Sequence, residues 1–156
     1  MRSSARRSFA TGLGSFGIGL AAFLVSPFAL AQPPAGECPQ PRFTGKAPAE
    51  YLALKDPLPS DAQNLKAGEK LFLGKSDGAR CAMCHGKKGD GKGPMAEQFV
   101  PRPRNFACAE TVNGIPDGQL FWIIRFGSPG TSMPAHDELD DTQIWQLVAH
   151  LRRLAR

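Results

Sequence analysis

Apolar positions recur at helical spacing in three stretches of the chain, and the clearest stretch lies near the C-terminus. Its apolar stripe consists of Ile144, Leu147, Val148 and Leu151. Asp140 precedes the stripe, and Gln143 follows Asp140 three residues later, which is the pattern of a capping box. Basic side chains at positions 152, 153 and 156 suit the negative end of a helix dipole. The pattern therefore predicts a helix that begins after Asp140 and continues toward the C-terminus.

Two further helices are predicted upstream from the same periodicity. The first begins after Asp61 and ends at Gly74, and its apolar face includes positions 65, 71 and 72. The second begins near Asp117 and ends at Gly127, with apolar side chains at positions 120, 121 and 124. No alternating apolar and polar stretch of useful length competes with these helices, so the predicted fold class is all-α.

Glycine and proline interrupt much of the remaining chain. Between positions 81 and 104 they dominate, which predicts a loop with at most a short turn near residues 95–99. Prolines also recur from residue 32 to residue 59, at spacings too close for a helix or a central strand. We therefore expect residues 32–59 to form an irregular proline-rich arm and residues 60–156 to form one domain, which suits a chain of 156 residues.

The first residues have the pattern of an export signal. Arginines at positions 2, 6 and 7 precede an uncharged segment from residue 8 to residue 36, and Ala29-Leu30-Ala31 supplies the small residues that signal peptidase favours. The pattern predicts a signal peptide over residues 1–31, cleaved after Ala31, and a periplasmic mature chain. Two alternatives stay open. An uncleaved segment would anchor the chain in the membrane, and the arginine pair could belong to a twin-arginine signal.

Composition and charge narrow the functional classes. With 42% hydrophobic and 21% charged residues, the chain is typical of a globular protein rather than of a disordered or multi-span membrane protein. The net charge of +5 includes the three arginines of the predicted leader, and without them it is +2. No dense basic run is interleaved with aromatic residues, so nucleic acid is not an expected partner.

One motif carries chemistry: Cys81-Ala82-Met83-Cys84-His85 is a Cys-x-x-Cys-His run, the attachment signature of a c-type haem. On a short helical turn, two cysteines three residues apart can each bond a vinyl group of one porphyrin, and the adjacent histidine then directs its imidazole at the iron. A redox-active dithiol would need a preceding strand, and a zinc site would need a second ligand pair at finger spacing. The sequence shows neither. We predict one covalent haem c on Cys81 and Cys84, with His85 as an iron ligand.

The opposite axial ligand must come from elsewhere in the chain, and Met133 is the best candidate. It lies in a stiff, helix-free segment, residues 127–134, that can lay a thioether over the far face of the haem. A methionine ligand would raise the reduction potential. Met83 lies inside the attachment turn and Met95 only ten residues past the histidine, so both fit less well. Two alternatives stay open: Met133 has no role at the iron, or His136 ligates and gives bis-histidine coordination.

These features together resemble the class I cytochromes c, over residues 61–156. The resemblance rests on the attachment turn, the glycine-rich segment that ends in Gly93-Pro94, the Met133-Pro134 loop and the three helices. It implies a fold of three or more helices around one covalently bound haem. It also implies that a proline carbonyl of the glycine-rich segment accepts the second ring N–H of the iron-bound histidine, and Pro94 matches that position best.

The resemblance further implies that the first and last helices cross. Gly68 would permit their close approach, and Phe72 and Trp145 would pack beside the crossing. Two cysteines remain outside the attachment motif, Cys38 in the arm and Cys108 before the middle helix. In an exported chain a leftover pair should oxidise, so we predict a disulfide that ties the arm to the domain. Two free thiols or an intermolecular bridge are the alternatives.

The function that the resemblance implies is that of a single-electron carrier and not an enzyme, because a haem ligated on both faces has no open position for substrate. Its partners would be redox proteins that dock transiently at the haem edge, and the chain would act as a monomer. Five residues flank the turn and form either a positive docking rim or an ordinary solvated surface: Lys75, Arg80, Lys87, Lys88 and Lys92. Two alternative functions are a cytochrome subunit of a larger exported dehydrogenase or oxidase, and a haem enzyme or gas sensor with an open distal site.

Overall fold

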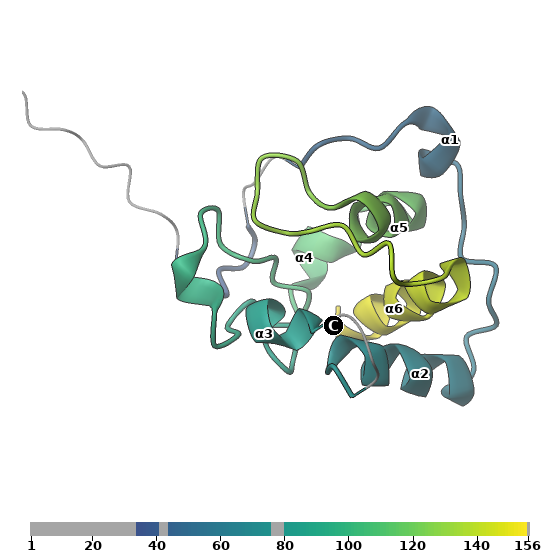
Figure 1. Ribbon diagram of the computed structural model, residues 1–156, viewed down its shortest axis with the longest axis horizontal. Coiled ribbons are helices and arrows are strands. Elements are labelled where there is room, and N and C mark those ends of the chain that lie inside the picture. The colour runs from purple at the N-terminus through teal and green to yellow at the C-terminus, as the bar shows by residue number, and fades with distance from the viewer. Residues whose placement is uncertain (1–33, 41–43, 76–79, 156) are drawn as a thin grey trace, which may run out of the picture. The chain divides into compact units, whose positions relative to one another are not determined.

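The computed structural model describes residues 34–40, 44–75 and 80–155, and the predicted signal peptide lies outside them. Every regular element of the described residues is helical: α1 (Ala49–Leu52), α2 (Ala62–Phe72), α3 (Cys81–His85), the 3-10 turn η1 (Ala96–Gln98), α4 (Ala109–Val112), α5 (Asp117–Phe126) and α6 (Asp141–Leu154) (Figure 1). This confirms the all-α prediction. No helix within the described ranges is long and apolar enough to cross a membrane.

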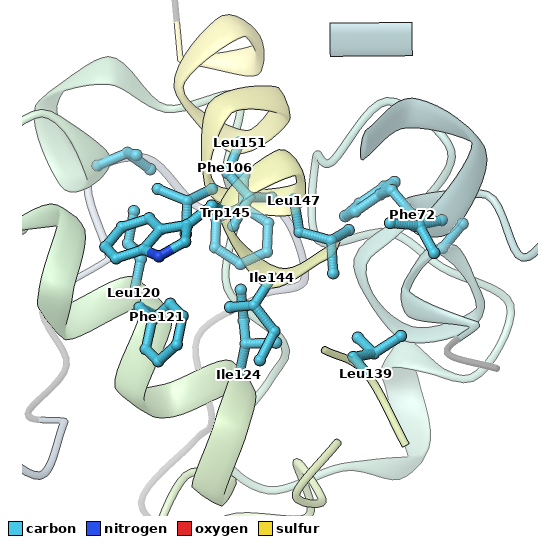
Figure 2. Packing of buried hydrophobic residues seen from close by; sticks show 14 residues of the cluster. Phe72, Phe106, Leu120, Phe121, Ile124, Leu139, Ile144, Trp145, Leu147 and Leu151 are labelled. Carbon is cyan, nitrogen blue, oxygen red and sulfur yellow. The ribbon is translucent and has the colours of Figure 1, made fainter. Parts of the chain in front are cut away.

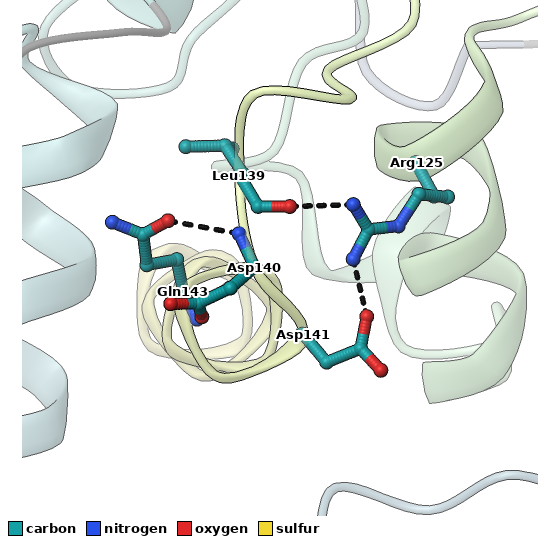
Figure 3. A network of polar contacts seen from close by, with 5 residues as sticks. All are labelled: Arg125, Leu139, Asp140, Asp141 and Gln143. Carbon is teal, nitrogen blue, oxygen red and sulfur yellow. Dashed lines mark hydrogen bonds and ion pairs between the residues drawn. The ribbon is translucent and has the colours of Figure 1, made fainter.

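The three predicted long helices are α2, α5 and α6, and α2 and α6 begin at the aspartates that the sequence indicates. The Asp61 carboxylate accepts a hydrogen bond from the Asn64 N–H at 2.8 Å at the start of α2. At the start of α6 the capping box is complete, and Figure 3 shows its bond between the Asp140 N–H and the Gln143 side chain. The Asp140 carboxylate accepts from the Gln143 N–H at 2.8 Å, and the Asp140 N–H donates to the Gln143 side-chain oxygen at 2.9 Å.

α2 and α6 form the most extensive helix pairing of the described residues and lie side by side in Figure 1. Gly68 of α2 faces the backbone of α6. A Cβ atom at Gly68 would overlap the carbonyl oxygen of Gln146 and would lie 3.0 Å from the Cβ of His150. The close approach of the two helices therefore depends on the missing side chain, as the resemblance implied.

The two aromatic rings expected beside this crossing both belong to the buried core and have different ring partners. Phe72 packs against His150, with ring centroids 5.2 Å apart, whereas Trp145 packs against Phe121 of α5 at 4.6 Å. Helical geometry explains the different partners: position 150 lies four residues after Gln146 and shares its face of α6, while position 145 is turned about 100° away.

The buried core draws most of its side chains from α2, α5 and α6, with Ala82 from α3, Val112 from α4, and Phe106 and Leu139 from the connecting segments (Figure 2). Its largest fully buried members are Phe72, Ile144, Leu147, Val112 and Val148. Three of these residues belong to the apolar stripe predicted for the last helix, and its fourth member, Leu151, is also buried. The stripe therefore forms the face that α6 turns toward α2 and α5.

The proline-rich arm is not wholly irregular, because it contains the one-turn helix α1. Pro48 occupies the position before the first turn, where a missing N–H costs no helical hydrogen bond, and the next proline is Pro57. Tyr51 of α1 packs edge-on against Phe126 of α5 at 5.5 Å. The Gln119 side chain also fixes the arm, since it donates to the Gly45 carbonyl at 2.9 Å and accepts from the Ala47 N–H at 2.8 Å.

A disulfide joins Cys38 to Cys108, with Cα atoms 5.6 Å apart, as predicted from the sequence. It attaches the start of the described arm to the residue that precedes α4. α4 itself was not predicted, because its single turn is too short to display an apolar period. The bond closes a separation of 70 residues, which includes α1, α2 and α3.

Candidate functional site

The attachment motif folds as the short helix α3, and the glycine-rich segment packs directly against it. Three backbone N–H groups of that segment donate to α3 carbonyls: Gly91 to His85 at 2.8 Å, Gly93 to Cys84 at 3.1 Å, and Met95 to Met83 at 3.0 Å. A Cβ at Gly93 would lie 2.6 Å from the Cys84 carbonyl. Only glycine allows this segment to lie so close to the turn.

His85 is buried and held in one orientation. Its Nδ1 lies 2.9 Å from the Arg104 carbonyl oxygen and donates to it, since a carbonyl can only accept. Its ring also packs against Phe106, with centroids 4.6 Å apart. With the proton on Nδ1, Nε2 carries the lone pair that a metal ion binds. The ring is therefore in the tautomer that an iron ligand requires.

The expectation that the Pro94 carbonyl accepts the hydrogen bond from the His85 ring is wrong, because the acceptor is the Arg104 carbonyl. Arg104 lies 19 residues after His85 in the sequence. The chain folds back at this point because the Phe106 N–H donates to the Gly89 carbonyl at 2.6 Å, which brings Arg104 to the His85 ring. The arm fixes the same segment. The Gln40 side chain donates to the Pro103 carbonyl at 3.1 Å and accepts from the Asn105 N–H at 2.8 Å, on either side of Arg104.

Met133 lies in the connection between α5 and α6, which is ordered by hydrogen bonds within itself. The Met133 carbonyl accepts from the Ser128 N–H at 3.2 Å, and the Met133 N–H donates to the Thr131 hydroxyl oxygen at 3.1 Å. The end of the connection is tied to α5, because Arg125 donates to the Leu139 carbonyl and pairs with Asp141 (Figure 3). The thioether is thereby held on a fixed loop.

The candidate residues meet at one cavity of about 390 Å³. Its lining includes Cys81, Cys84, His85 and Met133, which are up to 52 residues apart in the sequence. His136 and Met95 line the same cavity. Much of the remaining wall is apolar and comes from the core of Figure 2: Phe72, Phe106, Ile124, Leu147 and Leu151. The sequence did not indicate Phe106 or Ile124 as site residues.

A second cavity of about 490 Å³ adjoins the first, and the two share Arg104, Phe106, Ile124, Met133 and Leu151 in their walls. The buried Ser128 hydroxyl lines the second cavity and has no hydrogen-bond partner among the described residues. Together the cavities offer a largely apolar space with a few polar groups in its wall. That is the chemistry of a large flat cofactor with a few polar substituents.

The two thiols differ from those of a redox-active dithiol. Burial raises the pKa of the Cys81 thiol to about 11, and the charges of Cys84 and Glu138 act in the same direction. Burial also raises the pKa of Cys84. Reactive Cys-x-x-Cys motifs instead have lowered thiol pKa values. Both thiols are free in the described structure and lie on the cavity wall, where they can be bonded to a cofactor.

The five basic residues that flank the turn in the sequence are all exposed: Lys75, Arg80, Lys87, Lys88 and Lys92. One of them, Arg80, also lines the cavity. Two exposed apolar side chains also belong to this region, Met83 at 40% and Val100 at 63% exposure. The exposed side chains along this stretch of the sequence therefore include several positive and two apolar groups.

The family model for cytochrome c matches residues 65–155. Among solved structures, a chain of the reducing HAO-like protein complex of Kuenenia stuttgartiensis is similar to this chain, with 27% sequence identity and a TM-score of 0.57. The similarity covers 67% of this chain and 49% of that one, so this chain spans about half the length of its structural relative. A search of curated proteins finds no match.

Proposed function

Because this chain belongs to the cytochrome c family, we propose that its haem iron is bound between His85 and Met133, and that it carries one electron at a time between partners outside the cytoplasm. The family and the Cys81/Cys84 pair imply one covalently attached haem c. The observation that carries the ligand assignment is the shared cavity, whose wall contains both thiols, the imidazole and the thioether.

The roles of the residues follow from their contacts. Cys81 and Cys84 hold the haem through thioether bonds, and the haem supplies an iron that alternates between the ferric and ferrous states. His85 is oriented by its hydrogen bond to Arg104 and by Phe106, and it offers Nε2 to the metal. Met133 offers a thioether, which favours the ferrous state and raises the reduction potential.

Two protein ligands leave the iron no position for a substrate, which is why we propose a carrier; members of this family are typically electron carriers rather than enzymes. Electrons would cross at the haem edge, to redox proteins that dock there through small, transient interfaces. The exposed mixture of Arg80, Met83 and the nearby lysines suits such docking.

Two observations support a location outside the cytoplasm. The N-terminal residues have the pattern of a cleaved signal peptide, and Cys38 and Cys108 form a disulfide, a bond typical of oxidising compartments. Mass spectrometry of the protein from a periplasmic extract tests the proposal. A mature N-terminus at Gln32 is the expected result, and a cytoplasmic chain with residues 1–31 retained would contradict it.

A second candidate is a subunit of a larger redox complex, because the similar solved chain belongs to a named protein complex. The two candidates share the same haem site and differ in their partners. Gel filtration of the protein at its natural expression level separates them: a mass near that of one chain supports a free carrier, and stable co-elution with another protein supports a subunit.

The ligand assignment is tested by visible spectroscopy of the haem-loaded protein. We expect the natural ferric protein to show the weak far-red band of methionine-bound haem, and Met133→Ala to lose it. Met95→Ala is the matched control, because it removes another methionine from the same cavity wall and should retain the band. If the reduced natural protein binds carbon monoxide readily, the iron has an open position and the carrier proposal fails.

A further inference from the structure

The cavity wall contains a second histidine in the same arrangement as His85. His136 lines the cavity, and its Nδ1 lies 2.9 Å from the Glu138 carboxylate. A carboxylate can only accept, so Nδ1 carries a proton, and in the neutral ring Nε2 then carries the lone pair. Metal-binding histidines usually have this arrangement, with one nitrogen donating to a carboxylate or a carbonyl and the other facing the metal.

His136 is also positioned by the backbone. Its N–H donates to the Ile124 carbonyl at 3.1 Å, and its carbonyl accepts from the Leu139 N–H at 3.4 Å. The imidazole is largely covered, with 16% of the side chain exposed. His136 lies three residues after Met133, on the same connection between α5 and α6, and lines the same cavity.

We propose that His136 is a reserve ligand of the haem iron, which binds when Met133 does not. This inference rests on the proposed function, because it assumes a haem in the cavity with Met133 as its distal ligand. An imidazole in place of the thioether removes the preference for ferrous iron, so the exchange lowers the reduction potential. The iron would remain closed to external ligands, and the protein would remain a carrier at a different potential.

The test uses haem-loaded Met133→Ala, His136→Ala and the double variant. Met133→Ala is expected to lose the far-red band and yet stay low-spin in its ferric state, whereas the double variant becomes high-spin. If His136 occupies the iron in about 90% of Met133→Ala molecules, carbon monoxide binds that variant about tenfold more weakly than the double variant, because only the open fraction can bind. His136→Ala alone should retain the natural far-red band.

Two controls distinguish His136 from other groups and from unfolding. Met133→Ala combined with Met95→Ala removes the other cavity methionine and should remain low-spin. Free imidazole added to the double variant should restore a low-spin spectrum if the cavity is intact.

A high-spin Met133→Ala overturns the inference, whatever the double variant does. Equal carbon monoxide affinities of Met133→Ala and the double variant, to within about twofold, overturn it as well. Failure of the proposed function would appear in a different measurement: the natural protein would lack the far-red band or would bind carbon monoxide.

Discussion

Gly68→Ala is the single substitution that most directly tests how the helices around the haem cavity are held together. On helix propensity alone the change should stabilise α2, by about 1 kcal/mol. The structure predicts the opposite sign. The added Cβ would overlap the Gln146 carbonyl oxygen, lie 2.6 Å from the Gln146 carbonyl carbon and lie 3.0 Å from the His150 Cβ.

The magnitude follows from what the new methyl group meets. Backbone atoms cannot move away by changing a rotamer, so α2 and α6 must separate along their contact. Inserting a methyl group into a packed interior costs about 1–3 kcal/mol and sometimes more. With backbone as the obstacle we expect the upper end of this range, about 3 kcal/mol, and a net loss of about 2 kcal/mol after the gain in helix propensity.

Urea unfolding of the haem-loaded protein, followed by far-UV circular dichroism, measures this loss. Gly114→Ala is the control, because a Cβ there meets no heavy atom within 4 Å, and its unfolding free energy should stay within about 0.5 kcal/mol of the natural value. If Gly68→Ala is as stable as the natural chain or more stable, close backbone contact does not determine the α2–α6 crossing, and the reasoning is refuted.

Three further predictions concern other parts of the fold. Burial lowers the pKa of His150 below its usual value of about 6.5. The contribution of this residue to stability is therefore complete above about pH 6.5 and is lost as the pH falls through the folded-state pKa. Urea unfolding between pH 7 and pH 5 should show this decline, and His150→Phe should lessen it. Replacing Cys38 and Cys108 by serine should lower the unfolding free energy by about 4 kcal/mol, given a separation of 70 residues; a loss below about 1 kcal/mol would mean that the disulfide constrains little. Arg152 donates to Asp117 and to the carbonyls of residues 112 and 115. Arg152→Met should therefore lower the free energy of unfolding, measured in heat or urea, by about 2 kcal/mol. Asp117→Asn introduced into the Arg152→Met variant should lower it little further.

The elements that could be predicted from the sequence are those specified by neighbouring residues. α2 and α6 each have an apolar period and an aspartate cap, and both are local signals. The attachment motif is local too, and Met133 stands out because it lies in a short segment where glycine and proline exclude a helix. The structure places these residues on one cavity.

What could not be predicted depends on contacts between distant residues. The acceptor for His85 is the Arg104 carbonyl because a bond from Phe106 to Gly89 folds the chain back, and no sequence signal at Arg104 indicates this. α1 lies in the gap between Pro48 and Pro57, which is wide enough for one helical turn although the proline content of the arm as a whole predicts irregular structure.

The two sides of the cavity are held by different kinds of contact, and this bears on which iron ligand can exchange. On the His85 side, the acceptor segment is fixed by backbone hydrogen bonds, by the Gln40 side chain and by the disulfide-linked arm. On the Met133 side, the connection is tied to α5 by hydrogen bonds, from Arg125 to the Leu139 carbonyl and from the His136 N–H to the Ile124 carbonyl. The ion-pair partner of Arg125, Asp141, is 75% exposed, and exposed ion pairs contribute at most about 1 kcal/mol. Among the described contacts, only the His85 side therefore has a covalent tie. A ligand exchange that leaves His85 in place is the one that this asymmetry favours.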